Sequence, residues 1–225
     1  MLLVVGGIKG GSGKTTIATN LCQMRAANGY KVLLVDADEQ KSAYDWALQR
    51  DSAGLSLNSF KNSTAFVSIC LSGKAVYSNL VKMREDYDDI IVDTGGRDTT
   101  SQRAALCDAD KFLLPFKPSS IDIWTMGGVK QMISECVNPK LTSYAIISQA
   151  DHKGMDNSEA LEILREFEEI TCLPFFIGNR KAFRNAAAEG LGVHELVPRD
   201  DKACKEMKAL YDEIYPVSKA YTSHI

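Results

Sequence analysis

The residues Lys9-Gly10-Gly11-Ser12-Gly13-Lys14-Thr15-Thr16 decide the fold of this chain. The apolar run Leu2 to Ile8 precedes them, and a stretch with helical periodicity, Thr15 to Asn28, follows and is closed by Gly29. A strand, a glycine-rich loop and a helix in this order form the context of a P-loop, because the N–H groups of the loop and of the helix N-terminus then surround phosphate groups. The stretch therefore predicts a site for the phosphates of a nucleotide.

Lysine and hydroxyl side chains follow the glycines at the spacing that phosphate chemistry uses. We expect Lys14 to lie against the β- and γ-phosphates and the Thr15 hydroxyl to bind Mg²⁺. An ordinary glycine-rich turn is the alternative, but composition alone rarely yields Gly-Lys-Thr-Thr in this context. The strict pattern has a further glycine where this chain has Ile8, followed by Lys9.

The early lysine, Lys9, makes the loop similar to the deviant Walker-A loop of the ParA/MinD family, and the chain resembles a small ParA-type partitioning ATPase. The resemblance implies ATP and Mg²⁺ as cofactors, nucleotide contacts from Lys9 to Thr16, and a homodimer when ATP is bound. In that dimer Lys9 would reach the phosphates of the partner subunit and offset negative charge there, as an arginine finger does. A solvated loop lysine is the alternative.

Carboxylates end two further apolar runs. The segment Val35-Asp36-Ala37-Asp38-Glu39-Gln40 resembles the Asp-x-Asp-Pro-Gln switch segment of the same family, with Glu39 in place of the usual proline. By that resemblance Asp38 positions the attacking water and Asp36 supports the metal, and capping of the strand end by either aspartate is the alternative. The run Ile90-Ile91-Val92-Asp93 has the form of a Walker-B element, in which Asp93 would hold a Mg²⁺-bound water. Residues 94–98 stand where the family has its second switch.

Short runs rich in Val, Ile and Leu alternate with stretches of helical periodicity along the whole chain. The candidate strands are Leu2–Ile8, Val32–Asp36, Ile90–Asp93, Phe112–Phe116, Tyr144–Ser148 and Phe175–Ile177. This alternation predicts an α/β fold, a P-loop three-layer sandwich with a mostly parallel sheet and helices on both faces. No linker or repeat divides the sequence, so we expect a single domain over residues 1–225.

Three segments carry local predictions. Asn157-Ser158 is the expected N-cap of a helix from Ser158 to Glu169. Residues 51–74, rich in Ser, Asn and Gly, suggest loops around one short strand or helix. The segment Val197-Pro198-Arg199-Asp200 is expected to be a loop near the nucleotide, which makes Pro198 a candidate contact, and Ser148–Asp151 ends a strand where relatives contact the base.

Composition restricts the cellular setting. The formal net charge is −3, so DNA binding requires a local basic patch rather than overall charge. The six cysteines form no C-x-x-C pair, which favours reduced thiols in the cytoplasm. No apolar run approaches the ~20 residues of a membrane helix, and the tail after Pro216 has no amphipathic stripe, so we expect no membrane attachment. Because the P-loop begins at Lys9, we expect no helix-turn-helix domain before it.

Basic residues gather in the last third of the chain, on stretches with helical periodicity. The candidate DNA-binding residues are Arg180, Lys181 and Arg184 on one stretch, and Lys202, Lys205 and Lys208 on the next. The ATPases that the chain resembles bind DNA without sequence preference through such residues, and phosphate contacts alone suffice for that. A solvated helix face, diluted by acidic neighbours, is the alternative.

Together these features predict an ATP-dependent dimerising ATPase that binds nucleoid DNA. Its main expected task is partition of plasmid or chromosomal DNA, with hydrolysis stimulated by a ParB-like centromere-binding partner. One alternative is the positioning of a protein cargo, such as a microcompartment or a chemoreceptor cluster, through an adaptor protein. A P-loop metabolic ligase of similar fold is a weaker alternative, since such relatives generally lack an early lysine like Lys9.

Overall fold

A single sheet organises the protein. The computed structural model describes residues 1–55, 66–120, 123–151 and 156–216. Within these ranges seven strands form one sheet in the order β3-β2-β4-β1-β5-β6-β7, and every pairing is parallel. The strands are β1 (Leu2–Val5), β2 (Val32–Asp36), β3 (Val67–Cys70), β4 (Asp89–Asp93), β5 (Lys111–Phe116), β6 (Thr142–Ala150) and β7 (Thr171–Gly178).

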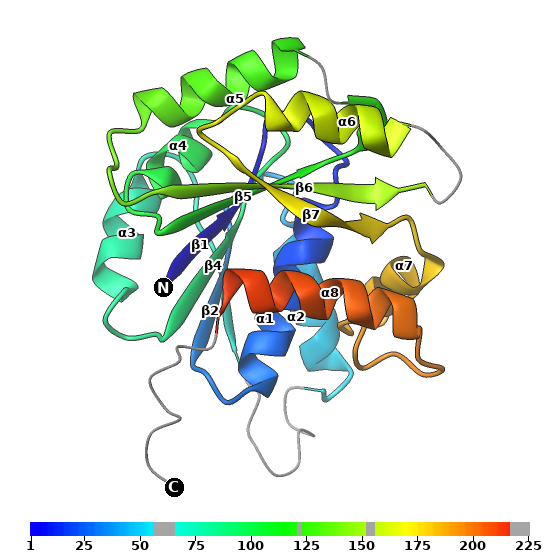
Figure 1. Cartoon of the computed structure of the whole chain (residues 1–225). Coiled ribbons are helices and arrows are strands. Elements are labelled where there is room, and N and C mark those ends of the chain that lie inside the picture. Colours follow the sequence, from blue (N-terminus) through cyan, green and yellow to red (C-terminus); the bar gives the residue numbers. More distant parts are fainter. Residues whose placement is uncertain (56–65, 121–122, 152–155, 217–225) are drawn as a thin grey trace, which may run out of the picture.

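Helices cover both faces of the sheet (Figure 1). In the described part of the chain they are α1 (Lys14–Ala27), α2 (Ser42–Ser52), α3 (Ala75–Met83), α4 (Thr100–Leu106), α5 (Ile123–Glu135), α6 (Asp156–Arg165), α7 (Lys181–Ala188) and α8 (Asp201–Ile214). Successive strand residues point to opposite faces, so β1 contributes to two separate cores. Leu3 and Val5 pack with α1, α2, α7 and α8, whereas Leu2 and Val4 pack with α3 to α6.

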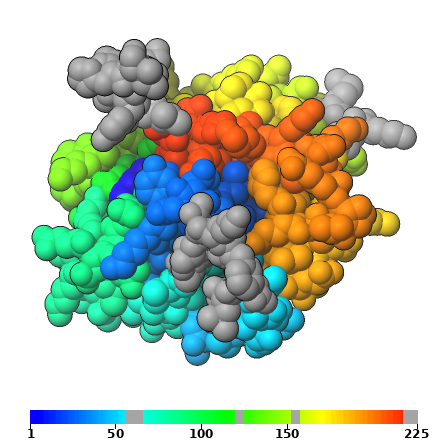
Figure 2. All heavy atoms as spheres, turned by 90° about the horizontal axis from the view of Figure 1, so that it is seen from below, coloured from blue at the N-terminus to red at the C-terminus, as the bar shows by residue number. Residues whose placement is uncertain are grey.

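The first of these layers forms the surface seen from below in Figure 2, where α1 (blue) lies between α2 (cyan) and α8 (orange to red). The central strands β1, β2 and β4 are buried along their whole length. Burial on both faces explains why these strands are continuous apolar runs without polar alternation.

The structure confirms the α/β fold with helices on both faces, and the described sheet is parallel throughout rather than mostly. All six expected strands occur. The first ends at Val5 instead of Ile8, and glycines begin directly after it. Side chains pack closely against Gly6, where a Cβ would lie 2.5 Å from Gln102 Oε1. Strand β3 lies within the weakly informative residues 51–74, part of which falls outside the described residues.

The N-cap prediction at Asn157-Ser158 was wrong. Helix α6 begins at Asp156, which places both residues in its first turn, and it ends at Arg165 rather than Glu169. The Asn157 side chain instead donates a hydrogen bond to the carbonyl of Asp151 (2.8 Å). Asn and Ser favour caps only through such local hydrogen bonds, and here the bond is made to the preceding strand end.

Parallel strands bring the predicted motifs to one edge of the sheet. Asp36 at the end of β2 is in register with Asp93 at the end of β4, which in turn is in register with Val5 of β1. The loop after β1 therefore begins beside both carboxylates. The carboxyl edge of an open parallel sheet is where such folds bind ligands.

Candidate active site

A cleft of about 950 Å³ opens at this edge. Its walls come from the P-loop, from the segment after β2, from the segment after β4, and from one residue near the end of β6. The lining residues are Gly10–Thr16, Ala37–Gln40, Ser42, Gly95–Thr99, Ser101 and Gln149. The structure thus brings together the P-loop and both expected switch segments, which are separated by tens of residues in the chain.

Two P-loop glycines have backbone conformations that favour glycine. Gly11 and Gly13 have φ values of 70° and 87°, in the left-handed region that costs a side-chain-bearing residue energy. A Cβ on Gly13 would also lie 2.8 Å from Ser148 Oγ. The amide of Gln149 donates to the Gly11 carbonyl (2.7 Å), so the end of β6 supports the loop from behind.

Lys14 and Ser12 bring hydrogen-bond donors to the wall of the cleft. Lys14 is buried, and its ammonium donates to the Lys9 carbonyl (2.9 Å). Burial lowers the pKa of Lys14, while the nearby carboxylates of Asp93 and Asp38 act in the opposite direction. The buried Ser12 hydroxyl finds no hydrogen-bond partner among the described residues. Such donors fit the oxygen atoms of a phosphate chain.

Asp93 and Thr15 form the centre of the expected metal site. The Thr15 hydroxyl donates to Asp93 Oδ2 (2.7 Å), and Asp93 Oδ1 is buried without a partner in the described part of the protein. Burial raises the pKa of Asp93 to about 8, and the Thr15 hydrogen bond opposes that change. The residues fit Mg²⁺, which prefers oxygen ligands and keeps several waters: Thr15 would bind it directly and Asp93 through a water. The ion would neutralise charge on the phosphates.

Asp36 makes different contacts from Asp93 on the neighbouring strand. Its oxygens accept from the backbone N–H groups of Asp38 (3.0 Å) and Tyr44 (2.9 Å). Burial raises its pKa, and those backbone hydrogen bonds lower it. These contacts are those of the capping alternative: Asp36 holds the turn after β2 and the first turn of α2, and its role as a metal ligand stays a prediction.

Asp38 lines the cleft, and Gly95 lies against it while Gly96 lies against the P-loop. A Cβ on Gly95 would be 3.2 Å from Asp38 Oδ1, and one on Gly96 would be 2.4 Å from Gly10 Cα. The segment after β4 is therefore in direct backbone contact with the P-loop. A side chain at position 96 would collide with the P-loop backbone, which gives Gly96 of this sequence a physical reason.

Sequence reasoning missed Gln102, which is fully buried on α4. Its side-chain oxygen accepts from the Gly7 N–H (2.9 Å) and from the Thr94 hydroxyl (2.6 Å). Gln102 thereby joins the start of the P-loop to the start of the second switch segment. No local pattern marks it, because both partners become neighbours only in the folded sheet.

Two further predicted nucleotide contacts are the early lysine Lys9 and Pro198. Lys9 is half-buried and supplies its carbonyl to Lys14. Pro198 is exposed and does not line the cleft of the described chain. Its role as a nucleotide contact stays a prediction.

The basic candidates divide into paired and exposed residues. Arg180, only 11% exposed, donates to both carboxylate oxygens of Glu206, so α7 is tied to α8. Lys208 pairs with Asp212 one turn away on α8. Lys181, Arg184, Lys202 and Lys205 are exposed on the same two helices. Arg180 would have to break its ion pair with Glu206 before it could contact DNA, and its side chain is largely buried. The exposed cations do not have this cost, so they are better placed to contact DNA.

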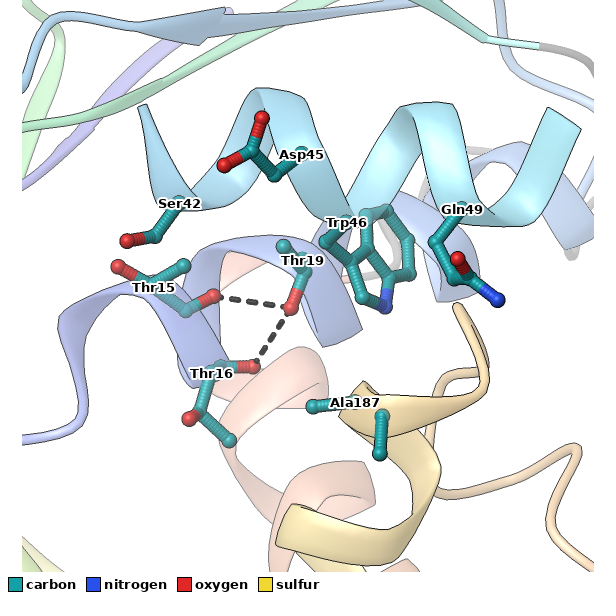
Figure 3. Close-up of a pocket in the computed structure, with 9 residues that line it drawn as sticks. Thr15, Thr16, Thr19, Ser42, Asp45, Trp46, Gln49 and Ala187 are labelled. Atoms are coloured by element: carbon teal, nitrogen blue, oxygen red, sulfur yellow. Dashed lines mark hydrogen bonds between the residues drawn. The ribbon is translucent and has the colours of Figure 1, made fainter. Parts of the chain in front are cut away.

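A second hollow of about 390 Å³ adjoins the cleft between α1, α2 and α7. Figure 3 shows Thr15, Thr16 and Ser42 at one end, with Asp45 and Trp46 further along. Thr15, Thr16 and Ser42 line both spaces. The Thr19 hydroxyl is turned inward, toward the carbonyls of Thr15 and Thr16.

No helix in the described ranges is long and apolar enough to cross a bilayer. Nor do the described residues contain a cluster of three His, Cys, Asp or Glu side chains suited to a metal. A nucleotide-bound Mg²⁺ does not require such a cluster, because phosphate oxygens and waters fill most of its positions.

Known proteins share this arrangement. Residues 3–193 match the family described as CobQ/CobB/MinD/ParA nucleotide binding domain. The chain is 28% identical over 218 residues to the maintenance of carboxysome distribution protein A of Halothiobacillus neapolitanus, covering 95% of this chain and 96% of that protein. It is 30% identical over 138 residues to protein ParA of Rhizobium radiobacter, covering 60% of this chain and 56% of that protein.

A solved structure agrees with these matches at the level of the fold. Apo McdA of Cyanothece superposes with a TM-score of 0.71 at 19% identity, covering 92% of this chain and 98% of that one. The family match spans the P-loop, both switch segments and most of the sheet. The chain therefore belongs to the CobQ/CobB/MinD/ParA nucleotide-binding family and is a P-loop ATPase of the ParA/MinD type.

Proposed function

We propose that the protein is an ATP-driven positioning ATPase that moves a protein cargo over DNA. One observation carries the choice of cargo: the match to a carboxysome distribution protein runs over 95% of this chain, whereas the match to ParA covers 60%. The alternative from the sequence, a protein cargo reached through an adaptor, therefore has better support than partition of DNA.

The cleft supports hydrolysis of ATP bound with Mg²⁺. Lys14 and the N–H groups of the P-loop bind the phosphates, and Thr15 with Asp93 holds the metal. Asp38 orients the attacking water, since its carboxylate faces the same cleft. Lys9 completes the site of the partner subunit in an ATP-bound homodimer, so that hydrolysis separates the subunits.

The exposed cations on α7 and α8 support binding to nucleoid DNA. Lys181, Arg184, Lys202 and Lys205 contact DNA phosphates, while Arg180 and Lys208 stay in their ion pairs with Glu206 and Asp212. Contacts of this kind read no base sequence. A protein that moves over a whole nucleoid has to bind DNA of any sequence.

Partition of plasmid or chromosomal DNA is the second candidate. The 30% identity to ParA of Rhizobium radiobacter favours it, over the part of the chain that matches. The two functions differ in the partner that stimulates hydrolysis, a cargo adaptor in one case and a ParB-like centromere-binding protein in the other.

Binding of the purified protein to arbitrary duplex DNA, with ATP, ADP or no nucleotide, tests the proposal. We expect binding with ATP alone, and weakening as salt rises. Lys181→Ala with Arg184→Ala should weaken it and reduce the log–log salt slope by about 2. The control is Lys74→Ala with Lys82→Ala, which removes an equal exposed charge from the two ends of α3, on the other face of the sheet. DNA binding that is absent in every nucleotide state would refute the DNA-based mechanism.

Cargo is tested separately in cells that produce a fluorescent fusion of the protein. If a strain that lacks the gene for this protein loses the even spacing of a protein assembly but retains its plasmids, the result supports the protein cargo. Loss of plasmids, with protein assemblies evenly spaced, supports partition instead.

A further inference from the structure

A lysine outside the P-loop and both switch segments lies beside the P-loop. Lys117 directly follows β5, the strand that pairs with β1, so it emerges at the carboxyl edge next to the loop that β1 feeds. It is half-buried. Its ammonium would be 3.6 Å from a Cβ placed on Gly11, which puts a positive charge against the middle of the phosphate-binding loop.

Gly11 relates Lys117 to the cleft, whose described lining includes Gly11 but not Lys117 itself. Gly11 lines the cleft and is supported from β6 by the Gln149 amide. Its neighbour Gly10 lies against Gly96 of the second switch segment. The adjoining Gly95 lies against the carboxylate of Asp38. If Asp38 positions the attacking water, as its resemblance to the family's switch residue implies, the outermost phosphate lies at this end of the cleft.

Acidic side chains outnumber basic ones in the lining of the cleft. Asp38, Glu39 and Asp98 stand against Lys14 and Arg97. A γ-phosphate adds further negative charge in the same place. A cation beside Gly11 therefore offsets repulsion that ATP experiences and that ADP, lacking the γ-phosphate, largely avoids.

We propose that Lys117 is a phosphate-binding residue of the nucleotide site: its ammonium contacts the γ-phosphate of ATP and makes the site bind ATP more tightly than ADP. Lys14 and Lys117 then approach the phosphate chain from two sides, one from helix α1 and one from the end of β5. The proposal concerns ATPase chemistry alone and does not depend on DNA or on the cargo.

Calorimetric titration with a non-hydrolysable ATP analogue and with ADP, both with Mg²⁺, tests it. Lys117→Met keeps the length of the side chain and removes the charge. We expect the affinity for the ATP analogue to fall about tenfold and that for ADP to change less than about twofold. Lys117→Arg should restore most of the preference. The control is Lys140→Met, an exposed lysine just before β6, at the opposite edge of the sheet.

An unchanged ratio of the two affinities in Lys117→Met would overturn the proposal, and so would an equal loss for both nucleotides. If Lys117→Met does not fold, Lys117→Gln gives the same ratio to compare. Repeating the titration at two protein concentrations separates the site from the dimer. A preference lost only at the concentration where subunits associate would place Lys117 at a subunit contact and also refute the assignment.

Discussion

Burial and the Thr15 hydroxyl act in opposite directions on the Asp93 carboxyl, and burial prevails. Its pKa rises from the ordinary 3.8 to about 8, so the nucleotide-free fold keeps Asp93 protonated at neutral pH. A carboxyl with a raised pKa stabilises the fold below its ordinary pKa, and that stability is lost as pH rises through the folded pKa. Metal binding needs the carboxylate and releases this proton.

The first prediction follows from that linkage. Between pH 6 and pH 8.5 the nucleotide-free protein should lose thermal stability, while its affinity for Mg²⁺ with ADP rises. Calorimetry in two buffers of different ionisation enthalpy should detect a proton released on binding at pH 7. Asp93→Asn, which cannot titrate, should show neither trend. Proton release that persists in Asp93→Asn would assign the linkage to another group.

At the scale of elements, the segment after β4 touches the P-loop through backbone alone. Gly96→Ala would bring a Cβ to 2.4 Å from Gly10 Cα, so one of the two segments must shift. Since misplacing reacting groups by about 1 Å costs up to about 100-fold in rate, we expect ATP turnover to fall about 10–100-fold. Steady-state hydrolysis measures it.

The matched control for this substitution is Gly127→Ala. Gly127 lies within α5, where an added Cβ meets nothing within 4 Å, and alanine there should raise helix stability by about 1 kcal/mol without affecting turnover. Equal turnover in Gly96→Ala and the wild type would mean that the second switch segment leaves the P-loop during the reaction.

Helix α2 is attached to the loop after α7 by an ion pair. Arg50, 2% exposed, makes two hydrogen bonds of 2.7 Å to the Glu195 carboxylate and one to the Gly190 carbonyl. Removing one partner of a buried pair leaves the other charge uncompensated. Glu195→Ala should therefore lower the free energy of unfolding by about 2 kcal/mol, since Glu195 keeps some solvent contact.

Urea titration measures this loss, and Arg199→Ala is its control. Arg199 forms an ion pair with Asp201 on the surface, where such pairs contribute less than about 1 kcal/mol. If both variants lose the same small amount, the Arg50–Glu195 pair does not anchor α2.

At the scale of the whole molecule, we expect ATP to join two subunits through Lys9. Light scattering with size exclusion should show a dimer with a non-hydrolysable ATP analogue and a monomer with ADP. Lys9→Ala should stay monomeric with both nucleotides and lose dimer-coupled turnover, while Lys140→Ala behaves as the wild type. A Lys9→Ala protein that dimerises and hydrolyses normally would leave Lys9 as a solvated loop lysine.

Much of this protein was predictable from its sequence because the signals are local. Burial on both faces makes β1, β2 and β4 continuous apolar runs, and such runs alternating with helical periods specify a parallel sheet. The P-loop is one contiguous segment, so its residues are close together in space whatever the rest of the fold is. Even the place of Asp93, the predicted Walker-B carboxylate, at the end of its strand could be found from the sequence.

Tertiary structure decided everything that joins distant residues. It turned Asp36 toward the first turn of α2, and it committed Arg180 to Glu206 instead of the surface. It also brought Gln102 and Lys117 to the P-loop, 95 residues from Gly7 in the first case. Apolar periodicity depends on residues that are close in the sequence, so the sequence alone is enough to recognise it. Partners of a buried polar group are chosen only when the packed sheet removes water and makes each unpaired donor or acceptor costly.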